Sequence, residues 1–373
     1  MLDHLYANNY KSFVNFKVEF SSLNLMLGKN GSGKSNVFRL IFGLLEIIRG
    51  SNKALETHFS PLTLTRWTKS RIQTFELKLS DSEHSYFYSI EIEQNTDEFK
   101  SSIISEKIVC DNSILYQMDE IKAVLYDDNS NGTLVLTDNN VSGVSFAPSD
   151  SKHSLLNKFK AAVYSVILCS SDPKAMVGIV EKEELGARVN FSNIASIYAG
   201  LVQTDTDIYG DLINVMREIN PSLRKLRIAM NSYGRRLKVD YEHNDVTCSY
   251  DLEELSDGEK MIFALYLLIY GYIKSGYTVL LDEPDNFLSL REILPWCNEL
   301  QDAIAESSSG QCIMISHHPE IIDLFAAANG IWMNRIKSGE SVIVDDLQKD
   351  RENRDLLKYS ELISRGMLDE TQW

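Results

Sequence analysis

The residues best suited to chemistry lie in the segment Gly-Lys-Asn-Gly-Ser-Gly-Lys-Ser, residues 28–35. Gly28 and Gly33, followed by Lys34 and Ser35, match the phosphate-loop pattern, in which glycines let backbone N–H groups surround a polyphosphate. In that chemistry Lys34 reaches the β- and γ-phosphates, and the Ser35 hydroxyl binds Mg²⁺. The segment therefore predicts a site for ATP and magnesium.

The flanking residues favour a phosphate loop over a glycine-rich turn that happens to contain a lysine. Apolar residues 25–27 are typical of the end of a buried strand, and residues 36–48 form a continuous helical pattern. Strand, glycine loop and helix are the context in which this motif marks a site, and the helix N-terminus adds its positive dipole end. The nucleotide-binding residues predicted here are Gly28, Asn30, Gly31, Ser32, Gly33, Lys34, Ser35 and Asn36.

A second candidate anion site lies at residues 255–260, Leu-Ser-Asp-Gly-Glu-Lys, before an apolar helix expected over residues 261–273. Ser256 is a natural N-cap and Glu259 completes a capping box, a role that requires no function. Capping alone does not account for Gly258 beside an exposed serine at a helix N-terminus, an arrangement that offers a second binding place for a phosphate. We therefore predict that Ser256, Gly258 and Glu259 contact the nucleotide.

Two carboxylates, Asp282 and Glu283, follow the apolar residues 278–281, which predict a buried strand. Ligands bind at the carboxyl ends of strands in α/β sheets, so we expect Asp282 to hold Mg²⁺ and Glu283 to polarise the attacking water. An acidic pair can also be a simple polar strand end. His317 follows another short apolar strand and could hydrogen-bond a γ-phosphate, although a lone histidine is more often structural. The predicted catalytic residues are Glu283, His317 and Lys34.

The elements that would position these residues belong to an α/β fold. Apolar and polar residues alternate over 72–93, which predicts antiparallel strands with one solvated face. The β-type residues at 2–7 and 16–20 predict two further short strands. Further strands are expected at 103–110, 113–118, 133–136, 226–231 and 237–242, and helical patterns occur at 153–166, 193–201 and 207–219. We predict an antiparallel N-terminal β-lobe, a mostly parallel core sheet and a helical insertion.

Four segments follow from this pattern. We expect an N-terminal ATPase lobe at residues 1–136 and a helical insertion at 137–220. A C-terminal ATPase lobe is expected at 221–345, and a helical tail at 346–373.

Composition restricts the partners and the compartment. The 373 residues carry a net charge of −16, which argues against non-specific coating of nucleic acid. The one basic stretch, residues 224–238, could contact DNA or RNA, or it could be a solvated face of a strand pair. The five dispersed cysteines and the lack of a secretory signal or a membrane-length apolar run predict a cytoplasmic protein without a membrane partner.

The four motifs in this order, together with Asn-Tyr-Lys-Ser-Phe at residues 9–13, resemble the ABC-type ATPase head. Within these heads the motifs resemble the RecF/SMC/OLD-like branch, and the resemblance covers residues 1–110 and 220–340. It implies a homodimer of heads with ATP between the phosphate loop of one copy and Ser256 of the other. Long coiled-coil arms and an appended nuclease domain, found elsewhere in that branch, have no counterpart here.

The resemblance also implies roles for individual residues. Asp282 is assigned to Mg²⁺, Glu283 to the catalytic base and His317 to the switch histidine. Asp285 matches the loop that crosses the dimer interface. Two weaker matches place Lys11 near the phosphates and make Gln73 the glutamine that contacts metal and water.

The expected function is a magnesium-dependent ATPase whose paired heads switch a partner protein or a nucleic-acid contact. The absence of an effector domain favours a component of an anti-phage defence system that acts with a separate nuclease or toxin. The alternatives are a RecF/SMC-like ATPase of DNA repair or recombination, a transporter-energising cassette, and a regulatory module that holds ATP without turnover.

Overall fold

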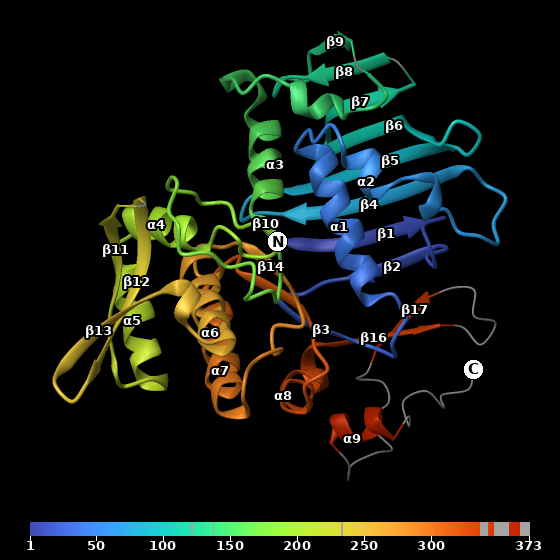
Figure 1. Ribbon diagram of the computed structural model, residues 1–373. Coiled ribbons are helices and arrows are strands. Elements are labelled where there is room, and N and C mark those ends of the chain that lie inside the picture. Colours follow the sequence, from blue (N-terminus) through green and yellow to red (C-terminus); the bar gives the residue numbers. More distant parts are fainter. Residues whose placement is uncertain (121, 137, 233, 336–341, 347–357, 366–373) are drawn as a thin grey trace. The chain divides into compact units, whose positions relative to one another are not determined.

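The structure is a computed structural model that describes residues 1–120, 122–136, 138–232, 234–335, 342–346 and 358–365 (Figure 1). The chain divides into two compact units. Unit 1 contains residues 1–166, 327–357 and 361–373, and unit 2 contains residues 167–326 and 358–360. The boundaries pass within β10 (Val166–Ser170), α8 (Pro319–Asn329) and α9 (Tyr359–Ser364).

Unit 1 is built on an eight-stranded antiparallel sheet in the order β2-β1-β4-β5-β6-β7-β8-β9. Its inward side chains, such as Phe75, Leu77 and Ile90, are fully buried, as the alternating sequence requires. The strands are β1 (Leu2–Asn8), β2 (Phe16–Glu19), β4 (Ile72–Ser80), β5 (Ser85–Asn95), β6 (Lys100–Cys110), β7 (Ser113–Asp119), β8 (Lys122–Tyr126) and β9 (Gly132–Leu136).

Three helices of unit 1 lie over this sheet (Figure 1), namely α1 (Lys34–Ile48), α2 (Ala54–His58) and α3 (Ser154–Tyr164). The Arg49 guanidinium ties the end of α1 to the end of α3, because it donates to the carbonyl oxygens of Val163 and Val166 at 2.8 and 2.7 Å. Unit 1 also holds β3 (Leu23–Leu27), which leads into the phosphate loop. Two further strands of this unit, β16 (Gly330–Arg335) and β17 (Val342–Asp346), form an antiparallel pair. The pair β3 and β16 is parallel.

Unit 2 combines helices with parallel and antiparallel strands. The strands β14 (Thr278–Asp282) and β15 (Gln311–Ile315) are parallel neighbours, and β11 (Leu223–Asn231), β12 (Gly234–His243) and β13 (Val246–Asp251) form an antiparallel sheet. The helices are α4 (Ile194–Thr204), α5 (Asp207–Ile219), α6 (Asp257–Leu268), which continues as a π-helical turn over Ile269–Ile273, and α7 (Leu290–Glu306).

The predicted fold class is confirmed: the chain is an α/β protein that contains an antiparallel N-terminal sheet and mostly parallel core strands. The helical patterns at 153–166, 193–201 and 207–219 correspond to α3, α4 and α5, although β10 begins within the first of them. The four-segment division stays a prediction, and much of residues 346–373 lies outside the described residues. None of the described helices combines the length and hydropathy that crossing a membrane requires.

Candidate nucleotide site

The phosphate loop lies in unit 1 between β3 and α1, as the sequence predicts. Its glycines adopt backbone angles that other residues rarely adopt, with φ of 144° at Gly28, 80° at Gly31 and 106° at Gly33. At Gly28 a Cβ atom would lie 2.3 Å from the carbonyl oxygen of Met333 on β16, so only glycine fits. The loop is therefore shaped by both its own glycines and the neighbouring strand.

Lys34 closes this loop on itself. Its buried Nζ donates to the carbonyl oxygens of Gly28, at 2.7 Å, and Lys29, at 3.2 Å. The Ser32 hydroxyl is buried and makes no hydrogen bond within the described part of the chain, while Ser35 is exposed at the first turn of α1. A buried hydroxyl without a partner, beside a lysine and a helix N-terminus, fits a loop that receives an oxyanion.

Two further predicted residues differ in their surroundings. Lys11, with φ of 52°, places Nζ 2.9 Å from Asn36 Oδ1 at the start of α1, and burial, followed by the nearby Arg39, lowers the pKa of its ammonium. Lys11 therefore lies beside the start of α1, although 25 positions separate it from Asn36 in the sequence. A partly desolvated ammonium there is electrostatically suited to a phosphate.

Gln73 has a different environment. Its side chain is fully buried; Nε2 donates to the Asn9 carbonyl oxygen at 2.9 Å, and Oε1 accepts from Gln94 Nε2 at 2.8 Å. A metal contact would require the amide to exchange these bonds and reach solvent. Its metal role stays a prediction that this arrangement does not favour.

The second group of predicted residues lies in unit 2. Ser256 is the N-cap of α6, and the capping box is present: Ser256 Oγ accepts from the Glu259 N–H at 3.3 Å, and Glu259 Oε2 accepts from the Ser256 N–H at 3.0 Å. The Ser256 hydroxyl also donates to Glu259 Oε2 at 2.7 Å. Gly258 lies against the next motif, because a Cβ there would be 3.0 Å from the Phe287 carbonyl oxygen.

The acidic pair occupies the predicted strand end. Asp282 is the last residue of β14 and pairs in register with Ile315 of β15, and the Glu283 N–H donates to the Ile315 carbonyl oxygen at 2.9 Å. Glu283 is exposed and has φ of 52°, a left-handed conformation that is uncommon outside glycine and frequent at functional sites. The chain therefore bends at Glu283, directly after β14.

Sequence reasoning missed two residues that hold this turn. Asn286 donates to the Glu283 carboxylate at 2.9 Å, and the Ser171 hydroxyl donates to the Glu283 carbonyl oxygen at 2.6 Å. The spacing of three residues could have indicated Asn286. Nothing local indicated Ser171, because it lies more than a hundred positions upstream.

His317 and Asp285 complete the set. His317 is exposed two residues beyond β15, and because β15 is the parallel neighbour of β14, it follows the same end of the strand pair as the acidic residues. Its neighbour His318 accepts from the Glu320 N–H at 3.3 Å and therefore serves the start of α8. Asp285 Oδ1 is buried and makes no hydrogen bond within the residues that the structure describes.

The basic stretch at residues 224–238 lies on β11 and β12, and five of its six lysines and arginines contact carboxylates. Arg236 Nη2 lies 2.8 Å from Glu253, and Lys238 Nζ lies 2.9 Å from Asp251. Arg224, Arg227 and Arg235 contact Glu242, Asp240 and Glu183. This pairing favours the interpretation as a strand-pair surface over a nucleic-acid contact, because a cation held by a carboxylate must give up that ion pair before it can neutralise a phosphate.

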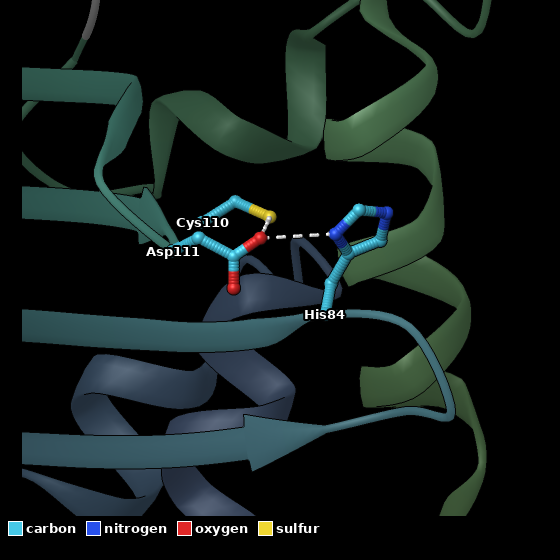
Figure 2. Close-up of side chains that lie close together, drawn as sticks. All are labelled: His84, Cys110 and Asp111. Atoms are coloured by element: carbon cyan, nitrogen blue, oxygen red, sulfur yellow. Dashed lines mark hydrogen bonds and ion pairs between the residues drawn. The ribbon is translucent and has the colours of Figure 1, made fainter.

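A separate polar cluster in unit 1 was not predicted. Figure 2 shows His84, Cys110 and Asp111 at the ends of β5 and β6, with His84 Nδ1 3.0 Å and Cys110 Sγ 3.8 Å from Asp111 Oδ2. Their types could ligate a metal, and their atoms lie within 4.8 Å of one another. The contacts are, however, accounted for by the hairpin end, where the Asp111 carboxylate also accepts from the Ser85 N–H.

Residues 23–323 match the sequence profile of the family described as "AAA domain, putative AbiEii toxin, Type IV TA system". No curated protein matches the chain.

Two solved structures are similar over most of the chain. One is the SMC head bound to the C-winged helix domain of ScpA, with a TM-score of 0.56 and 15% identity over 94% of this chain and 99% of that one. The other is an SMC head with an extended coiled coil, bound to the C-terminal domain of ScpA derived from Pyrococcus furiosus. It gives a TM-score of 0.55 and 14% identity over 94% of this chain and 97% of that one. At these identities the likeness concerns the fold.

Proposed function

The chain belongs to this family of AAA-domain P-loop ATPases, and we propose that it hydrolyses ATP with Mg²⁺ and pairs two copies around the nucleotide. The phosphate loop carries the proposal: three glycines in left-handed or related conformations, a buried lysine bonded to the loop carbonyls, and a buried serine hydroxyl without a partner. A polyphosphate supplies acceptors for the lysine and the hydroxyl together.

The proposed chemistry assigns a role to each of the predicted catalytic and metal-binding residues. Lys34 would exchange the Gly28 carbonyl for phosphate oxygens, while Ser35 and Asp282 would hold Mg²⁺. When bound, that ion neutralises the charge that develops on the phosphates. Glu283 would orient and polarise the attacking water, and His317 would donate to the γ-phosphate from the same strand edge.

Ser256 supports the pairing of two copies. Its hydroxyl is exposed at the N-terminus of α6, beside Gly258, where backbone N–H groups and the helix dipole favour an anion. We propose that this group contacts the nucleotide held by the phosphate loop of a second copy. Asp285, whose buried Oδ1 makes no hydrogen bond to any other described residue, would meet the same interface.

ATP-driven pairing would switch a separate partner protein. The family description names a toxin–antitoxin system, which supports a defence role with a separate nuclease or toxin as effector. The similar SMC heads were solved with domains of ScpA bound, which supports docking of a protein partner on this head as well. A repair function through nucleic-acid binding is less well supported, because most of the lysines and arginines on β11 and β12 contact acidic side chains.

The decisive experiment measures ATP turnover of the wild type and of Lys34→Ala, with and without Mg²⁺. Turnover that requires both the ion and Lys34 supports the proposal. Equal phosphate release by the two proteins would refute it and would assign any observed activity to a contaminant.

A further inference from the structure

A pocket with a volume of about 250 Å³ opens beside the start of α6 in unit 2. It lies outside the phosphate loop and the acidic strand end, and it shares Leu255 and Glu259 with the segment 255–260. Its lining residues are Asn220, Ser222, Tyr241, His243, Tyr250, Glu254, Leu255 and Glu259.

Aromatic rings form the walls of this pocket. Tyr241 and His243 alternate on β12, and Tyr250 lies on the paired strand β13 in the register that places it on the same face. The ring centroids of Tyr241 and Tyr250 are 5.8 Å apart at 64°, and those of Tyr241 and His243 are 6.4 Å apart at 29°. Such rings offer their negative faces to a cation.

Two carboxylates complete the lining, and neither is paired with a cation among the described residues. Glu254 accepts from the Asp251 N–H at 2.6 Å, and Glu259 accepts from the Tyr241 hydroxyl at 3.0 Å and from Ser256. No lysine or arginine lines the pocket. Its electrostatics therefore favour a cation and disfavour an anion.

Glu259 connects the pocket to Ser256. The serine hydroxyl has a single proton, and it donates that proton to Glu259 Oε2 at 2.7 Å. While this bond is made, the hydroxyl cannot donate to a phosphate oxygen. A cation that draws the Glu259 carboxylate into the pocket would break this bond. The Ser256 hydroxyl would then be free to donate to a phosphate oxygen.

We propose that the pocket binds a guanidinium group and that binding frees the Ser256 hydroxyl for the nucleotide. A planar guanidinium stacks on aromatic faces while it donates in parallel to carboxylates, which a compact ammonium does less well. Binding of the guanidinium is argued from the pocket alone. The proposed effect on the Ser256 hydroxyl rests on the proposed function, in which this hydroxyl contacts ATP.

Binding is tested by calorimetric titration of the full-length protein with agmatine, a free guanidinium compound. We expect saturable binding that is at least about tenfold weaker in Tyr250→Leu and Glu254→Gln. Glutamine retains the acceptor for the Asp251 N–H, so the second variant keeps the local cap. Tyr126→Leu and Glu93→Gln, on the sheet of unit 1, are matched controls. No binding, or equal binding by all five proteins, overturns the proposal.

The source of the guanidinium is separated in the same experiment. A blocked Gly-Gly-Arg-Gly-Gly peptide that binds more tightly than agmatine indicates an arginine of a partner protein, and the reverse order indicates a free metabolite. The peptide with lysine in place of arginine should bind more weakly. Equal binding of the lysine peptide would overturn the choice of guanidinium.

The coupling to Ser256 is read from turnover. Agmatine should raise ATP turnover by about fivefold or more in the wild type and leave Tyr250→Leu at its basal rate. Agmatine binding with unchanged ATP turnover refutes the coupling to Ser256, while the proposal that the pocket binds a guanidinium stands. Binding by a protein that never hydrolyses ATP refutes the proposed function instead, so the two failures can be distinguished.

Discussion

Lys34 Nζ lies 2.7 Å from the carbonyl oxygen of Gly28, so the lysine that would hold the phosphates is bonded to the first glycine of its own loop. The ammonium is already desolvated and positioned by the loop. Binding of ATP would then replace one oxygen acceptor with another, without first moving a solvated side chain into the site.

Replacement of Lys34 with alanine should abolish the nucleotide chemistry. We expect ATP turnover to fall by about 10²-fold or more, because both the phosphate contact and the charge stabilisation are lost. Nucleotide binding, followed with a fluorescent ATP analogue, should weaken as well. The control is Lys53→Ala, which removes an exposed lysine after α1; a similar loss there would show that the effect is not specific.

Replacement of Glu283 with glutamine should separate binding from turnover. The amide keeps the shape and the hydrogen bond from Asn286, but it cannot act as a base, so turnover should fall by about 10²-fold or more while ATP binding persists. Size-exclusion chromatography with ATP and Mg²⁺ should show a stable pair of copies. A variant that remains monomeric under these conditions would contradict the proposed pairing.

Asn286→Ala tests the orientation of that base. Loss of its hydrogen bond to the Glu283 carboxylate should lower the turnover number and leave the KM for ATP nearly unchanged, because the phosphate loop is untouched. We expect a reduction of about tenfold. A rise in KM with an unchanged turnover number would show that Asn286 serves binding instead.

Glu106 predicts a pH dependence of stability. Burial raises the pKa of its carboxyl to about 7, although hydrogen bonds from Ser142, at 2.6 Å, and Tyr88, at 2.9 Å, oppose this. A folded-state pKa above the ordinary value of 4.5 means that the stability from the protonated acid is fully present below pH 4.5 and is lost as the pH rises to about 7.

Glu106→Gln should therefore gain stability over the wild type as the pH rises from 5 to 8. The expected relative gain is about 2–3 kcal/mol, measured by urea unfolding at both pH values. Glu93→Gln, at an exposed position of β5, provides the control and should show no such trend. A difference between wild type and Glu106→Gln that stays constant with pH would contradict the raised pKa.

Arg236→Glu distinguishes a structural from a nucleic-acid role for the basic face. Arg236 contacts Glu253 at 2.8 Å and Asp251 at 3.5 Å, so reversing its charge should place three carboxylates together and lower the melting temperature by a few degrees, about 1–2 kcal/mol. Binding of duplex DNA, followed by fluorescence polarisation at low salt, should not change. A strong, salt-dependent loss of DNA binding in a protein of wild-type stability would restore the nucleic-acid interpretation.

The sequence predicts well those features that depend on residues a few positions apart. The capping box of Ser256 and Glu259 and the passage from β3 through the glycine loop to α1 follow from such spacings, because each involves one helix turn or one loop. The short, largely polar strand β13 escaped prediction, since pairing with β12 rather than its own pattern stabilises it.

By itself, the sequence determined the motif order, the acidic strand end and the α/β class, because local backbone preferences and hydrophobic periodicity encode these. Only the tertiary structure decided that Gln73 is enclosed between Asn9 and Gln94, and that the arginines of β11 and β12 meet carboxylates of other strands and loops. Burial and charge pairing depend on residues brought together from distant positions, and a one-dimensional pattern does not contain those distances.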